Sequence, residues 1–208
     1  MRAVIFDLDG TLIDSAPDIA ASLNRVLAAN GLAPLRMEQV LPMIGDGAKV
    51  LVERAFAARG EAATQERLAA FMADYAAHPV VHTKPYEGIV PALERLRDDA
   101  RPLAVCTNKS SRAAAEVLEI LRLSRFFNAV VGGDATPYRK PDPRHLAAAL
   151  SALEVTDAIM AGDHANDMKA AAGLRLPGVF CAWGYGEAEG EARAERPEEL
   201  PEVIARLG

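Results

Sequence analysis

The segment AVIFDLDGTL, residues 3–12, decides the fold of this chain. Its first four residues form a continuous apolar run, which is typical of a strand buried on both faces of a parallel sheet. Asp7, Asp9 and Gly10 follow directly. Ligands of open α/β sheets bind at the carboxyl ends of the strands, and residues two positions apart on extended chain face the same side. The segment therefore predicts a buried strand that presents Asp7 and Asp9 to a site.

Further apolar runs predict more strands of the same sheet. They are Leu103–Cys106, Ala129–Val131, Ala158–Ala161 and Val179–Ala182. Stretches with apolar residues at helical spacing lie around residues 89–96, 113–121 and 146–153. This alternation predicts an α/β fold with a Rossmann-like parallel sheet. The acidic stretch Glu187–Glu199 is expected to be a solvated turn that leads into a short final helix.

A long helical segment separates the first strand from the second. Ser15 and Asp18 have the spacing of a helix capping signal, and Gly31 is a favourable stop for the helix that follows. We predict that residues 15–80 form a helical cap inserted into the chain. Residues 1–14 and 81–208 would then form the catalytic core.

Composition narrows the classes of function. The 208 residues include 23 basic and 29 acidic side chains, for a net charge of −6. An acidic chain argues against nonspecific nucleic-acid binding, but a local site can still bind a small anion. The two cysteines, Cys106 and Cys181, lie in apolar runs and are expected to be buried thiols.

The N-terminal segment has no signal-peptide pattern, and no segment is long and apolar enough to span a bilayer. We therefore expect a soluble, cytoplasmic protein without a membrane partner. The sequence leaves open whether it is a monomer or a homodimer.

Four polar segments follow predicted strands and are candidates for one shared site. The first holds Asp7 and Asp9, and the others are Thr107-Asn108, Lys140-Pro141, and Gly162-Asp163 with Asp167. Each has an ordinary alternative: Asp, Thr and Asn are favoured helix caps, and most lysines are solvated. Their order along the chain favours a site, because parallel strands end at one edge of a sheet. Clustered carboxylates repel each other unless a cation joins them, and carboxylate oxygens suit Mg²⁺.

These motifs resemble those of the haloacid dehalogenase superfamily, and the resemblance covers essentially the whole chain. It implies that Asp7 attacks phosphorus as a nucleophile and that Asp9 acts as general acid and base. Thr107, Asn108 and Lys140 would hold the phosphoryl oxygens. The metal would be bound by Asp7, the backbone carbonyl of Asp9 and Asp163, with Asp167 close by. Dehalogenases lack the acid at Asp9, so its presence points to phosphoryl transfer.

One departure from the family pattern is His164, which stands where many relatives carry Ser or Thr. We expect it to be solvated or to lie behind the metal ligands. Within the superfamily the chain is most similar to phosphoglycolate phosphatases. That similarity includes the cap segment GDGA, residues 45–48, and VERA, residues 52–55. Gly45 and Gly47 would let backbone N–H groups approach a small anion, and Lys49 or Arg54 would add positive charge; the ordinary alternative for these two side chains is a solvated helix face. The similarity implies a small anionic phosphate ester as substrate, with 2-phosphoglycolate as the best match.

Other functions share parts of this set. A phosphatase for a sugar or amino-sugar phosphate and a sugar-phosphate mutase would use the same catalytic residues. A signalling receiver domain also forms an aspartyl-phosphate, but it has no large helical insertion. A catalytically silent phosphate-binding protein is disfavoured by the intact set Asp7, Asp9, Lys140 and Asp163.

Overall fold

The computed structural model describes residues 1–208 and contains a six-stranded parallel sheet. In spatial order β5-β4-β1-β6-β7-β8, its strands are Ala129–Val131, Leu103–Cys106, Ala3–Phe6, Ala158–Gly162, Gly178–Cys181 and Ala192–Ala194. The first strand of the chain is central, and Val4 pairs with Leu103 on one side and Ile159 on the other. The predicted α/β fold with a parallel sheet is confirmed.

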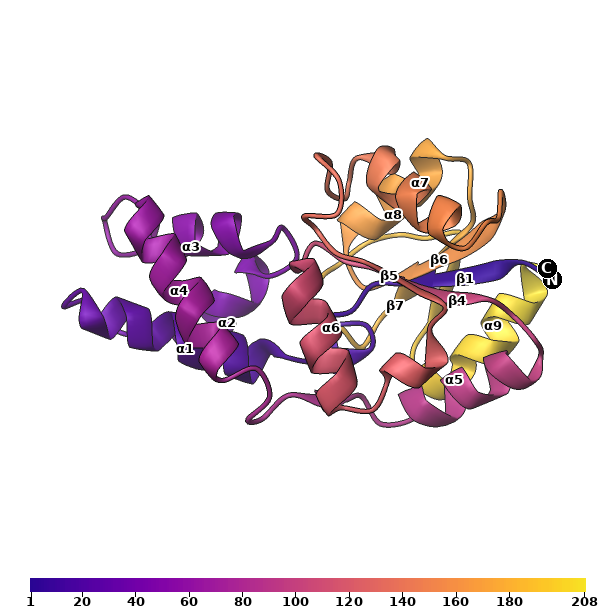
Figure 1. The fold of residues 1–208 in the computed structure, drawn as a ribbon, viewed down its shortest axis with the longest axis horizontal. Helices are drawn as coiled ribbons and strands as arrows, with labels where there is room; N and C mark the ends of the chain where they lie inside the picture. Colours follow the sequence, from indigo (N-terminus) through magenta and orange to yellow (C-terminus); the bar gives the residue numbers. More distant parts are fainter.

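Helices cover both faces of the sheet (Figure 1). The helices α5 (Ile89–Asp98), α6 (Ser111–Ile120) and α9 (Leu200–Arg206) pack on one face, and α7 (Pro143–Ala152) and α8 (Ala165–Gly173) pack on the other. Alternation along β1 produces two cores, because Val4 and Phe6 face the first set of helices and Ala3 and Ile5 face the second. Short 3₁₀ turns cover Leu41–Met43, Ser124–Phe126 and Pro197–Glu199.

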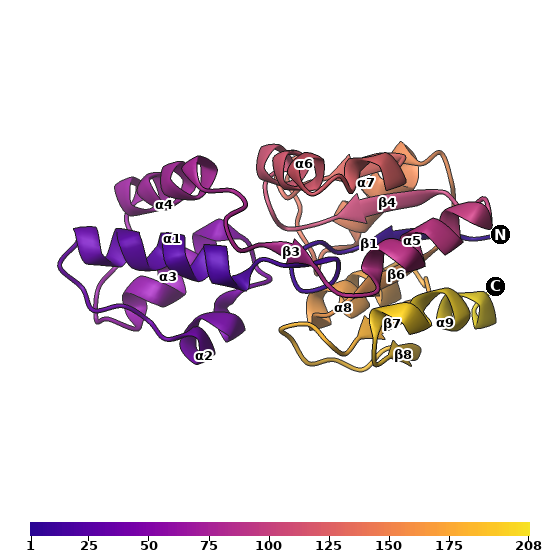
Figure 2. The ribbon, with the colours of Figure 1, turned by 90° about the horizontal axis from the view of Figure 1, so that it is seen from below.

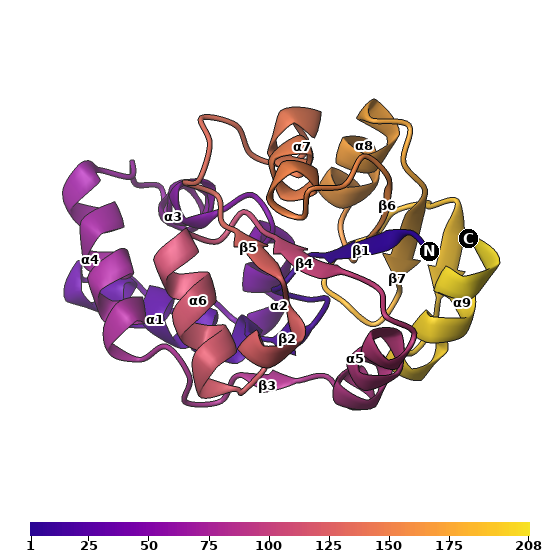
Figure 3. The same ribbon diagram turned by 45° about the vertical axis from the view of Figure 1, so that its right-hand side comes forward.

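Between β1 and β4, four helices form a separate group: α1 (Ala16–Ala29), α2 (Met37–Val40), α3 (Ala48–Ala57) and α4 (Gln65–Ala77). Leu23, Leu27, Val52 and Phe56 fill the core of this group and are fully buried. Figures 2 and 3 show the group beyond the carboxyl end of β1, at the far side of the molecule from the two chain ends. No helix has the length and apolar character needed to cross a bilayer.

Two chain segments join the helical group to the sheet. They form an antiparallel pair, β2 (Ile13–Asp14) with β3 (Lys84–Pro85). The predicted boundaries of the cap, between residues 14 and 15 and between residues 80 and 81, lie close to this strand pair in the sequence and stay a prediction.

Two local predictions are only partly correct. Ser15 occupies the N-cap position of α1, as expected, but neither Ser15 nor Asp18 caps the helix through its side chain. The Ser15 hydroxyl donates a hydrogen bond to Asp9 Oδ1 (2.6 Å), and Asp18 accepts hydrogen bonds from the backbone N–H groups of residues 81–83. The acidic stretch Glu187–Glu199 is also not only a turn, because it contains the edge strand β8.

Candidate active site

The Asp7 carboxylate lies at the end of β1 beside the ammonium of Lys140. Lys140 Nζ is 2.9 Å from Asp7 Oδ1 and 2.6 Å from Asp167 Oδ1. Burial alone would lower the pKa of Lys140, but the charges of Asp167 and Asp7 outweigh it and hold the pKa above its usual value. Lys140 therefore carries a positive charge between two carboxylates. The Lys140–Pro141 peptide bond is cis.

Asn108 places this lysine. Its amide oxygen accepts a hydrogen bond from the Lys140 N–H, and its amide nitrogen donates to the carbonyl oxygens of Lys140 and Gly45, each at 2.9 Å. The sequence predicts that Asn108 holds phosphoryl oxygens, whereas its side chain here joins three loops. Thr107 lines the adjoining cavity, and its hydroxyl accepts a hydrogen bond from the Lys109 N–H (3.2 Å).

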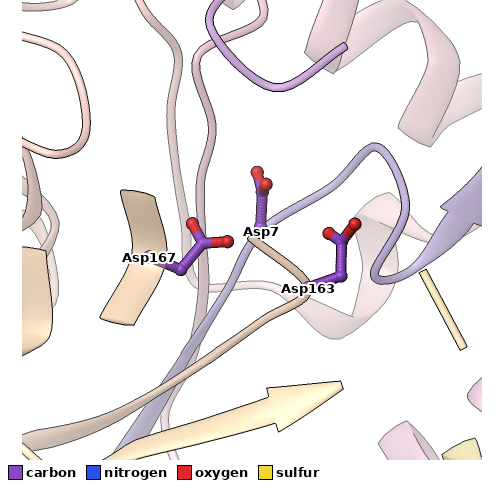
Figure 4. A group of neighbouring side chains, drawn as sticks. All are labelled: Asp7, Asp163 and Asp167. Atoms are coloured by element: carbon purple, nitrogen blue, oxygen red, sulfur yellow. The ribbon is translucent and has the colours of Figure 1, made fainter. Parts of the chain in front are cut away.

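Asp7, Asp163 and Asp167 bring one carboxylate oxygen each to within 4.8 Å of one another, and all three residues are buried (Figure 4). Asp163 follows β6, and Asp167 lies one turn further on, in α8. Two hydrogen bonds fix Asp163, from the Thr11 hydroxyl and the Tyr185 N–H, each at 2.8 Å. The carboxylates expected at separate strand ends therefore meet at one place.

The charges of this cluster fit a divalent cation. Burial, followed by the nearby charge of Asp7, raises the pKa of Asp163 to about 6. Burial also raises the pKa of Asp167, despite the opposing charge of Lys140. Three carboxylates against one ammonium leave two negative charges without compensation when all are ionised, and oxygen ligands of this kind suit Mg²⁺ or a similar hard ion.

Glycine allows the chain to approach the cluster closely. Gly10 has a φ of +86°, and a Cβ atom there would overlap the Asp163 carboxylate. A Cβ atom on Gly184 would overlap the same side chain from the opposite loop. Asp163 is thus held between two backbone segments that have no room for a larger residue.

His164 is the N-cap of α8. Its Nδ1 accepts a hydrogen bond from the Asn166 N–H (3.3 Å), and its own N–H donates to Asp167 (3.0 Å). His164 is half-buried in this position, and the expectation that it lies behind the metal ligands stays a prediction. The helix cap is His164, so Asp163 is left available to the cluster.

Asp9 contacts a residue that the sequence analysis did not select. Lys109 Nζ lies 3.0 and 3.1 Å from the two carboxylate oxygens of Asp9 and 2.8 Å from the hydroxyl of Tyr75, in α4. Burial lowers the pKa of Lys109, but Asp9 and Tyr75 more than offset this and the net pKa is raised. In the sequence, the only indication of a role for Lys109 is its position directly after Thr107-Asn108. No residue near it in the sequence identifies Asp9 and Tyr75 as its partners.

A cavity of about 300 Å³ lies between the sheet edge and the helical group. Asp7, Asp9, Thr107 and Lys109 line its floor, while α3 and α4 contribute apolar side chains such as Leu51, Phe71 and Met72. The Asp7 carboxylate therefore faces a space large enough for a small phosphate ester.

The structure separates the four predicted cap residues into two groups. Gly45, Gly47 and Lys49 line the cavity. Arg54 does not, because its guanidinium pairs with Asp46 at 2.6 Å. Arg139, which the sequence analysis did not select, also lines the cavity and donates a hydrogen bond to the Gly133 carbonyl (2.8 Å).

Known proteins are similar to this chain in sequence and in fold. The chain is 42% identical to a phosphoglycolate phosphatase of Caulobacter vibrioides over 190 residues, covering 88% of this chain and 80% of the relative. It is 38% identical to one from Cereibacter sphaeroides over 100% of this chain and 99% of the relative. A crystal structure described as a predicted phosphoglycolate phosphatase from Haemophilus somnus superposes with a TM-score of 0.90 at 25% identity, over 98% of this chain and 97% of that one.

A family model of haloacid dehalogenase-like hydrolases matches residues 4–179. This span runs from β1 through the helical group to β7, and so includes Asp7, Lys140 and Asp163. The expected family and the expectation of an enzyme are confirmed, and this chain belongs to the haloacid dehalogenase-like hydrolases.

Proposed function

We propose that this protein is a magnesium-dependent phosphatase that hydrolyses small phosphate monoesters, with 2-phosphoglycolate as its preferred substrate. The observation that carries the proposal is the buried contact between Asp7 and Lys140 at the edge of a cavity that Asp9 also lines. A carboxylate held at a strand end, with its charge balanced and its cavity face open, is arranged to attack phosphorus.

Asp7 would form an aspartyl-phosphate as the bond between phosphorus and the ester oxygen breaks. Asp9 would donate a proton to the departing alkoxide and later take one from the attacking water. Thr107 and Lys140 would hold the phosphoryl oxygens, and Asn108 would contribute by fixing Lys140.

The metal would be held by Asp7, the backbone carbonyl of Asp9 and Asp163, with Asp167 beside them. When bound, Mg²⁺ supplies positive charge that screens the phosphate from the attacking carboxylate. The substrate preference is supported by the names of the relatives and by two basic residues, Lys49 and Arg139, among those that line the cavity. Residues 15–80 would act as the cap that sets this preference.

The test is a phosphate-release panel with 2-phosphoglycolate, glucose phosphates and an amino-sugar phosphate, compared by kcat/KM. We expect 2-phosphoglycolate to rank first, turnover to stop with a chelator and return with Mg²⁺, and Asp7→Asn to be inactive. The surface variant Asp157→Asn serves as the matched control. Undiminished turnover by purified Asp7→Asn would remove the mechanism, and isomer formation from a glucose phosphate would identify a mutase instead.

A further inference from the structure

We propose that Lys109 is a positioning residue that fixes the carboxyl group of Asp9 against the leaving group, and that Tyr75 ties this lysine to helix α4. The inference rests on the proposed phosphatase function and extends it to two residues to which neither the sequence motifs nor the comparisons give a role.

The first step is the placement of the lysine. Its side chain is 8% exposed, and all of its polar contacts with other side chains go to two partners, Asp9 and Tyr75. A buried ammonium is stable only when its N–H groups are satisfied, so these contacts define one conformation. Lys109 is therefore a fixed group rather than a mobile surface charge.

The second step is what the lysine does to Asp9. The ammonium contacts both carboxylate oxygens, and the Ser15 hydroxyl adds a bond to Oδ1 at 2.6 Å. These contacts fix the plane and the position of the Asp9 carboxyl group, which lines the cavity. A proton donor must lie within hydrogen-bond reach of the oxygen that it protonates, and small displacements cost much of the rate.

The third step is the link to the helical group. Tyr75 lies in α4, its hydroxyl is 2.8 Å from Lys109 Nζ, and the ammonium is 4.5 Å from the centroid of its ring. Tyr75 itself stacks on Phe71, which lines the cavity. A shift of α4 would therefore move Tyr75 and, through its contact with Lys109, displace the Asp9 carboxyl group.

The alternative role for Lys109 is direct phosphate binding, because it also lines the cavity. The two roles differ in their dependence on the leaving group. A residue that acts through Asp9 matters when the departing oxygen is basic and matters little when it leaves readily. A phosphate ligand would matter equally for every ester.

The experiment measures kcat/KM, which reports steps up to release of the leaving group, for 4-nitrophenyl phosphate, phenyl phosphate and 2-phosphoglycolate. We expect Lys109→Met to lower the value by about 100-fold for the alkyl ester and by less than about threefold for the nitrophenyl ester. Tyr75→Phe keeps the aromatic ring and the ion pair between Lys109 and Asp9. We therefore expect the losses for the three esters to follow the same order, with a loss of about tenfold for the alkyl ester. Lys169→Met, at an exposed position of α8, should leave all three values unchanged.

A double-mutant cycle with the alkyl ester, for which the expected effect of Lys109→Met is large, provides a second readout. In an Asp9→Asn background, Lys109→Met should cause no further loss, because the group that it positions no longer donates a proton. Equal losses on all esters, or additive losses in the cycle, would overturn the role of Lys109 while leaving the phosphatase assignment intact. Absence of phosphate release by the wild type would overturn both. Should Lys109→Met fail to fold, the dependence of the Tyr75→Phe loss on the leaving group tests the role of Lys109 instead.

Discussion

Lys140 Nζ contacts Asp7 Oδ1 at 2.9 Å while sharing its charge with Asp167 at 2.6 Å, and the lysine side chain is 1% exposed. The site thus has an internal cation that balances part of the carboxylate charge before any metal binds. Removal of one partner from a buried ion pair leaves the other charge uncompensated, which costs more than the pair itself contributes.

Lys140→Met should therefore destabilise the protein by about 3 to 5 kcal/mol, measured by urea unfolding without added metal. Mg²⁺ should recover part of this loss, because a divalent cation can replace the missing charge. The exposed Lys169→Met variant should change stability by less than about 0.5 kcal/mol. A Lys140→Met protein as stable as the wild type would show that the carboxylates are not held ionised by this lysine.

The raised pKa of Asp163 predicts how the stability of the metal-free protein depends on pH. Its folded value of about 6 lies above the ordinary unfolded value of about 3.9, so the folded state binds the proton more tightly. The tighter proton binding adds up to about 3 kcal/mol to the free energy of unfolding. This added stability is fully present below about pH 4 and is lost as the pH rises through about 6. Urea unfolding in chelator from pH 4 to 7 measures it.

Asp163→Asn should flatten this pH dependence, and saturating Mg²⁺ should weaken it in the wild type, because the metal stabilises the ionised carboxylate. An unchanged slope in Asp163→Asn would assign the effect to other groups, such as Asp167.

The sheet could be predicted from the sequence because buried parallel strands are nearly continuous apolar runs. β8 is the informative exception. Its sequence is Ala-Arg-Ala, it lies at the edge of the sheet, and only Ala194 of the three is buried. An edge strand does not have to be apolar on both faces, so β8 lacks the continuous apolar run of the other strands. Its sequence therefore cannot be told apart from the polar turn residues around it. The prediction of side-chain capping by Ser15 and Asp18 failed for another reason: the partners of Asp18 lie more than 60 residues away, in the returning chain.

The convergence of Asp7, Asp163 and Asp167 was predictable, since parallel strands deliver their carboxyl ends to one edge. The contact from Lys109 to Tyr75 was not. It depends on how the four-helix group sits on the sheet, and the segments at that junction, such as the paired β2 and β3, come together from distant parts of the chain rather than by local pattern. Arg54 illustrates the same limit, because its partner Asp46 draws it away from the cavity lining.

Gly10 provides a test of the close approach to Asp163. Gly10→Ala introduces both a left-handed alanine and an overlap with the carboxylate, whereas Gly31→Ala introduces only the first, with open space around its Cβ. We expect Gly31→Ala to cost about 1 kcal/mol and Gly10→Ala to cost clearly more. Only Gly10→Ala should lose the increase in Tm caused by Mg²⁺, measured by thermal denaturation. Equal behaviour of the two variants would show that the loop moves aside without affecting the carboxylates.

Asp18 joins the outgoing and returning chains at the base of the helical group. It is 2% exposed and accepts bonds from the N–H groups of residues 81–83 and from the Thr83 hydroxyl at 2.6 Å. Burial raises the pKa of this carboxyl, but these hydrogen bonds outweigh it and leave the pKa below its usual value. The stabilisation is thus present above about pH 4 and lost as the pH falls further.

Asp18→Asn replaces one acceptor oxygen with an NH₂ group that would face these donors, so we expect a loss of about 2 to 4 kcal/mol at pH 7 by urea unfolding. Asp74→Asn is the matched control, because Asp74 pairs with Arg25 at the surface and should cost less than about 1 kcal/mol. If the helical group is held in place through Asp18, its loss should also raise KM for the phosphate ester, since α3 and α4 line the cavity. A destabilised variant with unchanged KM would mean that β2 and β3 alone keep the helices over the site.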